Sequence, residues 1–340
     1  MLRRALFLTL PFFLLSLCLS HGQVPKQIQA PADPLPSWNE GAAKKSIVEF
    51  VRATTDTASP KFVPIAQRIA TFDNDGTLWV EQPMYTQLMF ALGRVKAMAT
   101  QHADWKDKEA FKAVLDDNRA ALAKFTKKDL LEIIAATHAG MTTREFDAQA
   151  KDWLATAKHP RYKKLFTECA YQPMLEVMKY LRANGFKTYI VTGGGQQFVR
   201  CFSEQAYGIP PEQIIGSSGR LKYVKEAGPP SMLRLPALLL LNDEEGKPED
   251  IQLFIGCKPL AAFGNSDGDR QMLEWTQSGA GSRLMVLVHH DDAEREYAYG
   301  AQSKIGTFSD SLMAEAKQQG WLVISMKNDW KQIFSFEVLK

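Results

Sequence analysis

The segment 68–77 constrains the fold of this 340-residue chain more than any other stretch. Residues 69–72 form a near-continuous apolar run, which is typical of a strand covered on both faces. Asp73 and Asp75 follow the run two residues apart, so an extended backbone directs both side chains to the same side. Ligands of open α/β sheets bind beyond the carboxyl ends of the strands, and the pair therefore lies where chemistry is expected. A simple Asx-rich turn would have the same sequence, so the rest of the chain decides between a turn and a functional site.

Short apolar runs with polar, glycine-containing ends recur along the chain. Residues 186–191 run into Thr192 and Gly193, and residues 260–263 run into Gly264 and Asn265. Helical periodicity fills the intervals between the runs. This alternation predicts an α/β fold with a Rossmann-like, doubly wound parallel sheet.

The segment 84–183 departs from the alternation, because only helical patterns occur in it. Such an insertion directly after the first core strand predicts an all-helical cap over the ligand crevice. The predicted organisation is a signal peptide at 1–22, an α/β core at 23–83 and 184–340, and a helical cap domain at 84–183.

The N-terminus has the pattern of a secretory signal peptide. A basic start at residues 1–4 precedes an apolar run at 5–19, and small residues suited to cleavage follow. We therefore expect a secreted or periplasmic protein with no membrane association after cleavage; a lipoprotein anchored at Cys18 and an uncleaved anchor are the alternatives. The charge balance, 41 basic against 38 acidic residues, argues against nucleic acid as the main partner.

Three cysteines remain once the predicted signal peptide is removed: Cys169, Cys201 and Cys257. An odd number allows at most one internal disulfide, and the sequence leaves the pairing open. None of the three has a partner at the spacing of a zinc site. We interpret them as small buried apolar side chains rather than ligands.

Four short motifs occur in a specific order: Asp73-x-Asp75, Thr192-Gly193, a lysine at a helix start, and the turn 264–269 with the sequence Gly-Asn-Ser-Asp-Gly-Asp. They resemble the four motifs of haloacid dehalogenase superfamily hydrolases, in particular the phosphatase branch with a helical cap, such as phosphoserine phosphatases. The resemblance covers residues 68–289. It implies a Mg²⁺-dependent phosphomonoesterase that acts on small phosphorylated metabolites.

The resemblance also implies roles for individual residues. Asp73 matches the nucleophile that forms an aspartyl-phosphate, and Asp75 matches the general acid and base that distinguishes phosphatases from dehalogenases. Thr192 and the amide of Gly193 match the group that holds the phosphoryl oxygens. Lys247 matches the lysine that neutralises the charge of nucleophile and phosphate. Lys258 is the rival candidate, but it stands too close to Asn265 for an intervening helix.

The metal motif departs from the family pattern. The resemblance implies that three groups bind Mg²⁺: the Asp73 carboxylate, the Asp75 backbone carbonyl and the first acid of a Gly-Asp turn. This chain has Asn265 at the position of that acid. An amide oxygen can still bind Mg²⁺, with less charge than a carboxylate. Asp269 matches the second acid and ranks after Asn265, and Asp267 is an additional carboxylate that either supports the ion or solvates the turn.

Two further groups of residues have open interpretations. Trp79, Glu81 and Gln82 leave the first strand towards the predicted cap, where they are candidates to line the substrate entrance; the alternative for Trp79 is that it only packs at the hinge of the cap. His289 and His290 end a strand, and adjacent strand residues face opposite sides, so we interpret them as structural rather than as a shared metal site.

The sequence is also compatible with two rival functions. One keeps the fold and changes the chemistry to a phosphotransferase or phosphonatase; the other is a non-catalytic exported binding protein. The weakened metal position at Asn265 supports the second, and the intact Asp73, Asp75, Thr192 and Lys247 argue against it. The sequence leaves the natural substrate and the oligomeric state open.

Overall fold

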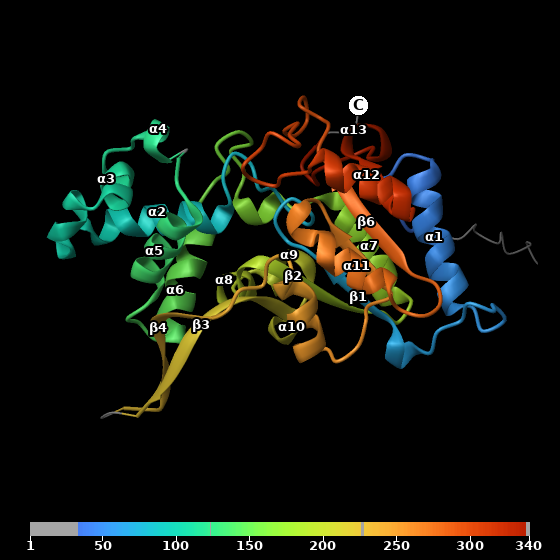
Figure 1. Ribbon diagram of the computed structural model, residues 1–340, viewed down its shortest axis with the longest axis horizontal. Helices are drawn as coiled ribbons and strands as arrows, with labels where there is room; N and C mark the ends of the chain where they lie inside the picture. The colour runs from blue at the N-terminus through green and yellow to red at the C-terminus, as the bar shows by residue number, and fades with distance from the viewer. Residues whose placement is uncertain (1–32, 123, 226–227, 338–340) are drawn as a thin grey trace, which may run out of the picture. The chain divides into compact units, whose positions relative to one another are not determined.

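The computed structural model describes residues 33–122, 124–225 and 228–337 (Figure 1). The predicted signal peptide at 1–22 lies outside the described residues. Within the described ranges, no helix has the length and apolar character needed to cross a bilayer.

Seven strands form one sheet in the order β4-β3-β2-β1-β5-β6-β7. Every neighbouring pair is parallel except β3–β4, which is antiparallel. This confirms the predicted α/β fold with a mostly parallel sheet. The strands are β1 (Ile69–Phe72), β2 (Lys187–Gly195), β3 (Ile214–Val224), β4 (Ser231–Leu240), β5 (Ala261–Gly264), β6 (Leu284–His289) and β7 (Leu322–Ser325).

Helices cover both faces of the sheet because both sets of alternating strand side chains are apolar. Phe72 and Phe263 belong to one buried cluster, while Val191 and Ala262, on the other face, belong to a second. The helices that contribute to the first cluster include α1 (Ala42–Thr55), α7 (Gln172–Ala183), α8 (Gln196–Arg200), α9 (Ser203–Tyr207) and α13 (Met326–Asp329). Those of the second are α10 (Gly246–Phe254), α11 (Arg270–Gln277) and α12 (Asp310–Gln319).

The strand register aligns the end of β1 with the positions in β2 and β5 that precede their motifs. Phe72, the last residue of β1, lies opposite Ile190 of β2 and Phe263 of β5. The residues that follow these positions therefore emerge at one edge of the sheet, which is where the sequence motifs lie.

The described residues between β1 and β2 contain helices and no strand of the sheet. Helices α2 to α5 share a buried cluster of their own, which includes Val95, Phe111 and Ile133. A capping box starts helix α6, since Glu145 N donates to Thr142 Oγ1 and Thr142 N donates to the Glu145 carboxylate. The bounds are α2 (Thr86–Met98), α3 (Glu109–Leu115), α4 (Arg119–Leu122), α5 (Lys127–His138) and α6 (Thr143–Leu154). The division of the chain into a cap at 84–183 and a core stays a prediction. Helix α7 lies within 84–183 but packs against strand β2 of the sheet.

Strands β3 and β4 continue past the sheet as a hairpin beside the inserted helices (Figure 1). Both α5 and α6 contact β4, and Gly140 N donates to the Arg234 carbonyl at 2.9 Å. Strand β3 runs without interruption from Ile214 to Val224. Short 3-10 turns occupy Ile65–Gln67, Ala99–Gln101, Ala103–Asp107, Phe166–Glu168, Pro211–Gln213 and Asp267–Asp269.

The three cysteines of the described residues are free thiols. Cys169 is buried and Cys201 is half-buried, but Cys257 is exposed. The expectation of burial is wrong for Cys257, because it lies in the exposed loop between α10 and β5.

Candidate active site

A tight turn after β1 positions the two aspartates. Asp73 N donates to the Phe263 carbonyl at 2.8 Å, which fixes the strand end against β5, and Leu78 N donates to the Asn74 carbonyl at 2.8 Å. Gly76 has φ +76°, and a Cβ there would overlap Asn265 and Glu81. Only glycine therefore permits both the backbone conformation and the close approach of these two side chains.

Lys247 lies buried between two carboxylates, with 2 % of its surface exposed. Its ammonium donates to Asp73 Oδ1 at 2.7 Å, to Asp269 Oδ1 at 2.6 Å and to the Val191 carbonyl at 3.1 Å, which satisfies all three donors. Burial alone would lower the pKa of Lys247, but Asp269 and Asp73 outweigh it and raise that pKa above its ordinary value. The structure thus places Lys247, and not Lys258, at Asp73; Lys258 is half-buried and donates to Ser278.

Asp269 ties the turn after β5 to Lys247. Its Oδ2 accepts from the amides of Asn265 at 2.9 Å and Ser266 at 3.1 Å, while Oδ1 contacts Lys247. A Cβ at Gly264 would overlap this carboxylate, so the glycine lets the aspartate reach back over the strand end. The side chain is fully buried and its oxygens are occupied by protein donors.

Asp73 and Asp75 differ in their partners. Burial raises the pKa of Asp73 well above its usual value, and Lys247 opposes the rise. Asp75 retains some exposure and accepts from Trp79 Nε1 at 3.0 Å and Asn74 Nδ2 at 3.2 Å. Burial raises the pKa of Asp75 as well, and these two hydrogen bonds oppose the rise.

Trp79 was expected either at the substrate entrance or at the hinge of the cap. It is buried and donates to Asp75, and its ring stacks on Phe202 at a centroid distance of 4.4 Å. Nothing in the local sequence signals this contact, because Phe202 lies far along the chain. Gln82 donates to Ser303 Oγ and to the Ile305 carbonyl, which ties it to the segment after β6.

Glu81 is buried beside the aspartate pair. Its Oε1 accepts from Tyr299 OH and from Asn265 Nδ2, each at 2.7 Å. Burial raises the pKa of Glu81 well above its usual value; the Tyr299 hydrogen bond opposes the rise and the Asp75 charge adds to it. Tyr299 belongs to no motif, so sequence reasoning missed it.

The glycine loop after Thr192 faces the inserted helices. Gly194 N donates to Thr192 Oγ1 at 3.0 Å, which leaves the hydroxyl proton available for a ligand. Gly195 N donates to Gln87 Oε1 at 2.6 Å, so helix α2 contacts the loop directly. Gln87 was not singled out in the sequence, since a lone glutamine on a helix carries no signal.

One cavity of about 220 Å³ collects most of the predicted site residues. Asp73, Asp75, Glu81, Thr192, Gly193 and Lys247 all line it. Asn265 and Asp269 lie behind this wall, and Ser266 and Gly268 of the same turn line the cavity in their place. The inserted helices and the segment before them contribute Tyr85, Gln87, Leu88, Leu130 and Ile134.

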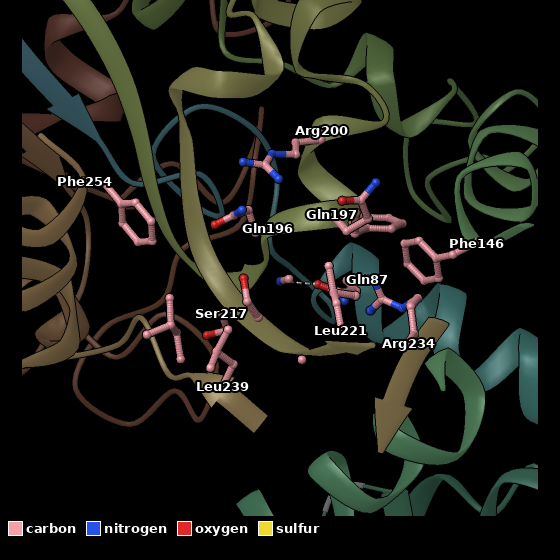
Figure 2. Close-up of a pocket in the computed structure, with 15 residues that line it drawn as sticks. Gln87, Phe146, Gln196, Gln197, Arg200, Ser217, Leu221, Arg234, Leu239 and Phe254 are labelled. Carbon is pink, nitrogen blue, oxygen red and sulfur yellow. Dashed lines mark hydrogen bonds between the residues drawn. The ribbon is translucent and has the colours of Figure 1, made fainter. Parts of the chain in front are cut away.

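A different cavity, of about 350 Å³, lies beyond Gln87 and Gly195 (Figure 2). Arg200, Arg234 and Leu221 are among the residues around it. None of the residues that line it is an aspartate or a lysine, so it offers no counterpart of the Asp73 site.

The oxygen donors near Asp73 fit a magnesium ion. Among the described residues, no three His, Cys, Asp or Glu side chains are arranged to hold a metal, but Mg²⁺ keeps several waters and needs only one or two carboxylates. Lys247 occupies Oδ1 of Asp73, and no hydrogen bond from the described residues reaches Oδ2. Asn265 Oδ1 accepts only from Thr77 Oγ1, at 3.2 Å, within that same set. Asp267 instead accepts from Ser309 and Arg270.

His290 supports the catalytic turn from behind. Its Nε2 donates to the Gly76 carbonyl at 2.8 Å, and its Nδ1 lies 3.2 Å from Glu296 Oε2. His289 contacts Asp291 instead, so the two histidines have separate partners. The interpretation of the pair as structural missed the contact between His290 and the turn, which brings together residues 214 positions apart.

Comparison with known proteins identifies the family. The family described as haloacid dehalogenase-like hydrolase matches residues 70–274. No curated protein sequence matches the chain. A conserved protein of unknown function from Anaerococcus prevotii DSM 20548 shares the fold, with 15% identity, a TM-score of 0.56, and coverage of 86% of this chain and 94% of that one.

Two more distant structures are also similar. A protein of unknown function from Bordetella pertussis Tohama I has 17% identity and a TM-score of 0.47, with coverage of 76% of this chain and 98% of that one. A probable phosphoserine phosphatase from Vibrio cholerae has 14% identity and a TM-score of 0.36, with coverage of 66% and 57%. The family match spans most of the chain and includes the turns that carry Asp73, Thr192, Lys247 and Asn265. The chain therefore belongs to the haloacid dehalogenase-like hydrolases.

Proposed function

We propose that this hydrolase is an exported, Mg²⁺-dependent phosphomonoesterase that cleaves small phosphorylated metabolites through an aspartyl-phosphate on Asp73. The observation that carries the proposal is the shared cavity, where Asp73, Asp75, Thr192 and Lys247 meet although they lie on separate elements. The small volume favours small substrates.

The proposed reaction has two displacements. In the first, an Asp73 oxygen forms a bond to phosphorus as the ester P–O bond breaks, and Asp75 gives its proton to the leaving alcohol. In the second, Asp75 takes a proton from water, whose oxygen bonds to phosphorus as the bond to Asp73 breaks. Phosphate is released and both carboxyl groups return to their starting states.

The other residues bind the phosphoryl group or orient the reacting side chains. The Thr192 hydroxyl and the Gly193 amide hold phosphoryl oxygens, and Lys247 neutralises charge beside Asp73. Mg²⁺, held by Asp73, the Asp75 carbonyl and Asn265, would neutralise phosphate charge. Asp269 acts on this site by fixing Lys247 and the Asn265 amide. Trp79 orients Asp75.

The rival chemistries have weaker support. A phosphonatase that works through a cap lysine needs that lysine in the cavity, and Lys247 is the only lysine among the described residues that line it. A non-catalytic binding protein would not require the buried Lys247 between two carboxylates, whose desolvation is costly. A phosphotransferase shares the first displacement and differs only in the acceptor of the second.

The activity is tested on the protein that lacks residues 1–22. p-Nitrophenyl phosphate hydrolysis is measured with Mg²⁺ or with EDTA, in wild type and Asp73→Asn, with Lys258→Ala as a control outside the site. We expect metal-dependent hydrolysis that is lost in Asp73→Asn and retained in Lys258→Ala. Hydrolysis that survives in Asp73→Asn contradicts the mechanism, and phosphate transfer to added alcohols in place of hydrolysis favours the phosphotransferase.

Export and the cap are separate parts of the proposal. Export rests on the sequence of residues 1–22, and N-terminal sequencing of secreted or periplasmic protein should show a start near residue 23. Intact chain retained in the cytoplasm would contradict it. The helices of 84–183 form the proposed cap, which contributes Gln87, Leu130 and Ile134 to the cavity.

A further inference from the structure

We propose that the natural substrates are phosphate monoesters of uncharged, apolar alcohols, that is, alkyl or aryl phosphates. The inference rests on the proposed phosphatase function and concerns the part of the cavity that would hold the alcohol. It follows from which charges face this space and which side chains form its outer wall.

The charges in the cavity do not suit a second anionic group. Among the described lining residues, Lys247 is the only cation, and Asp73 and Asp269 already share it. Glu81 and Asp243 add further carboxyl groups to the wall. An alcohol that carries a carboxylate or a second phosphate would lose water here without gaining a counter-ion, which is costly.

The outer wall of the cavity is apolar. Leu130 and Ile134 lie four residues apart on α5 and so share one face of that helix. Leu88 of α2 lines the same cavity, and α2 packs against α5. These three side chains are half-buried, so they keep apolar surface that an alcohol can cover.

A neighbouring apolar cavity of about 280 Å³ extends this surface. Gln87, Ile134, Gly193 and Gly194 line both cavities, so the two adjoin. Its further wall comes largely from the apolar strand β4 and the residues after it: Leu235, Pro236, Ala237, Leu238 and Leu241. Alcohols longer than the first cavity can hold therefore have apolar space to enter.

Arg234 is the one arginine near this extension, within the described lining residues. Its Nε donates to the His138 carbonyl at 2.7 Å, and its guanidinium lies 4.2 Å from the centre of the Phe146 ring. Arg234 thus has protein partners on the side of α5 and α6. It packs the hairpin against the inserted helices, and this role needs no anionic ligand.

The test compares three esters of equal chain length. Butyl phosphate, 4-(phosphonooxy)butanoate and 4-aminobutyl phosphate differ in the charge at the far end of the alcohol, and phosphate release gives kcat/KM for each. We expect kcat/KM for butyl phosphate to exceed that for the carboxylate ester by at least about tenfold. Equal values, or a preference for either charged ester, overturn the inference alone. Failure to release phosphate from all three esters and from p-nitrophenyl phosphate overturns the proposed function as well.

Two variants locate the preference on the apolar wall. Ile134→Arg and Leu130→Arg each place a cation there, and both should shift the ratio of kcat/KM values towards the carboxylate ester by about tenfold or more. Leu253→Arg is the matched control, because Leu253 is 66% exposed and lines neither cavity. The ratio is read only for variants whose thermal unfolding matches that of the control. A ratio unchanged in both folded wall variants contradicts the placement of the alcohol against α5.

Discussion

Replacing Lys247 with methionine should destabilise the fold as well as abolish activity. The substitution keeps a chain of similar length but removes the ammonium that contacts Asp73 at 2.7 Å and Asp269 at 2.6 Å. Both carboxylates are buried, with 7% and 0% of their surface exposed, so water cannot replace the lost cation fully. Removing one partner from a buried charge cluster typically costs about 3–5 kcal/mol of unfolding free energy, and we expect a loss in this range near pH 7.

The loss of unfolding free energy in Lys247→Met should become smaller as the pH is lowered. Burial raises the pKa of Asp73, and Lys247 opposes this rise, so the pKa of Asp73 climbs further in the variant. The folded variant then binds a proton more tightly than the unfolded chain does. Lowering the pH towards about 5 should recover part of the lost stability, since protonation removes one of the uncompensated charges.

Urea unfolding followed by circular dichroism measures this loss at both pH values. Lys258→Met is the matched control, because Lys258 is only half-buried, donates to Ser278 and lies 4.0 Å from the centre of the Trp275 ring, with no contact to Asp73. We expect the control to lose about 1 kcal/mol or less. If Lys247→Met costs no more than the control at pH 7, the buried charge cluster is not as described.

Three further changes test other parts of the structure. Burial, with help from Arg234 and Arg94, lowers the pKa of His138 to about 3. Between about pH 7 and pH 5 the unfolded chain therefore binds a proton at His138 that the folded protein does not bind. Over this range the unfolding free energy of wild type should fall by about 2 kcal/mol more than that of His138→Gln. Equal losses in denaturant unfolding would contradict this placement of His138. Asn265→Asp puts a second carboxyl group beside Glu81, so without metal the variant should unfold at a lower temperature than wild type. Added Mg²⁺ should raise the unfolding temperature of the variant more than that of wild type. An equal response to Mg²⁺ in the two proteins would show that Asn265 is not a metal ligand. Trp79→Phe keeps an aromatic ring on Phe202 but removes the donor to Asp75, and steady-state kinetics should show kcat reduced by about tenfold with KM little changed. An unchanged kcat would show that the hydrogen bond does not orient Asp75.

The parts of the fold that were predictable are those encoded locally. Strand β1 is short and apolar, and its aspartates and glycine follow at once, so one window of sequence contains both the strand and the turn. Thr142 and Glu145 likewise signal the start of α6 within four residues. Strand β7 (Leu322–Ser325) was missed because, although it is as long as β1, no motif follows it to mark its end.

The site was predictable in its motifs but not in its supports. Lys247 was chosen over Lys258 from the order of motifs along the chain, and the structure places it at Asp73. The partners of Glu81 and Gly76 could not be found in this way, because Tyr299 and His290 lie more than two hundred residues away and belong to no motif. Such contacts depend on how the segment after β6 folds back over the strand ends.

Trapping a phosphoenzyme shows directly whether Asp73 is the nucleophile. The protein is mixed with p-nitrophenyl phosphate and Mg²⁺, quenched in acid during turnover, digested, and analysed by mass spectrometry. The account predicts one phosphoryl group on the peptide that contains Asp73 in wild type, and none in Asp73→Asn. A phosphoryl group on another residue, or turnover by Asp73→Asn at the wild-type rate, would contradict it.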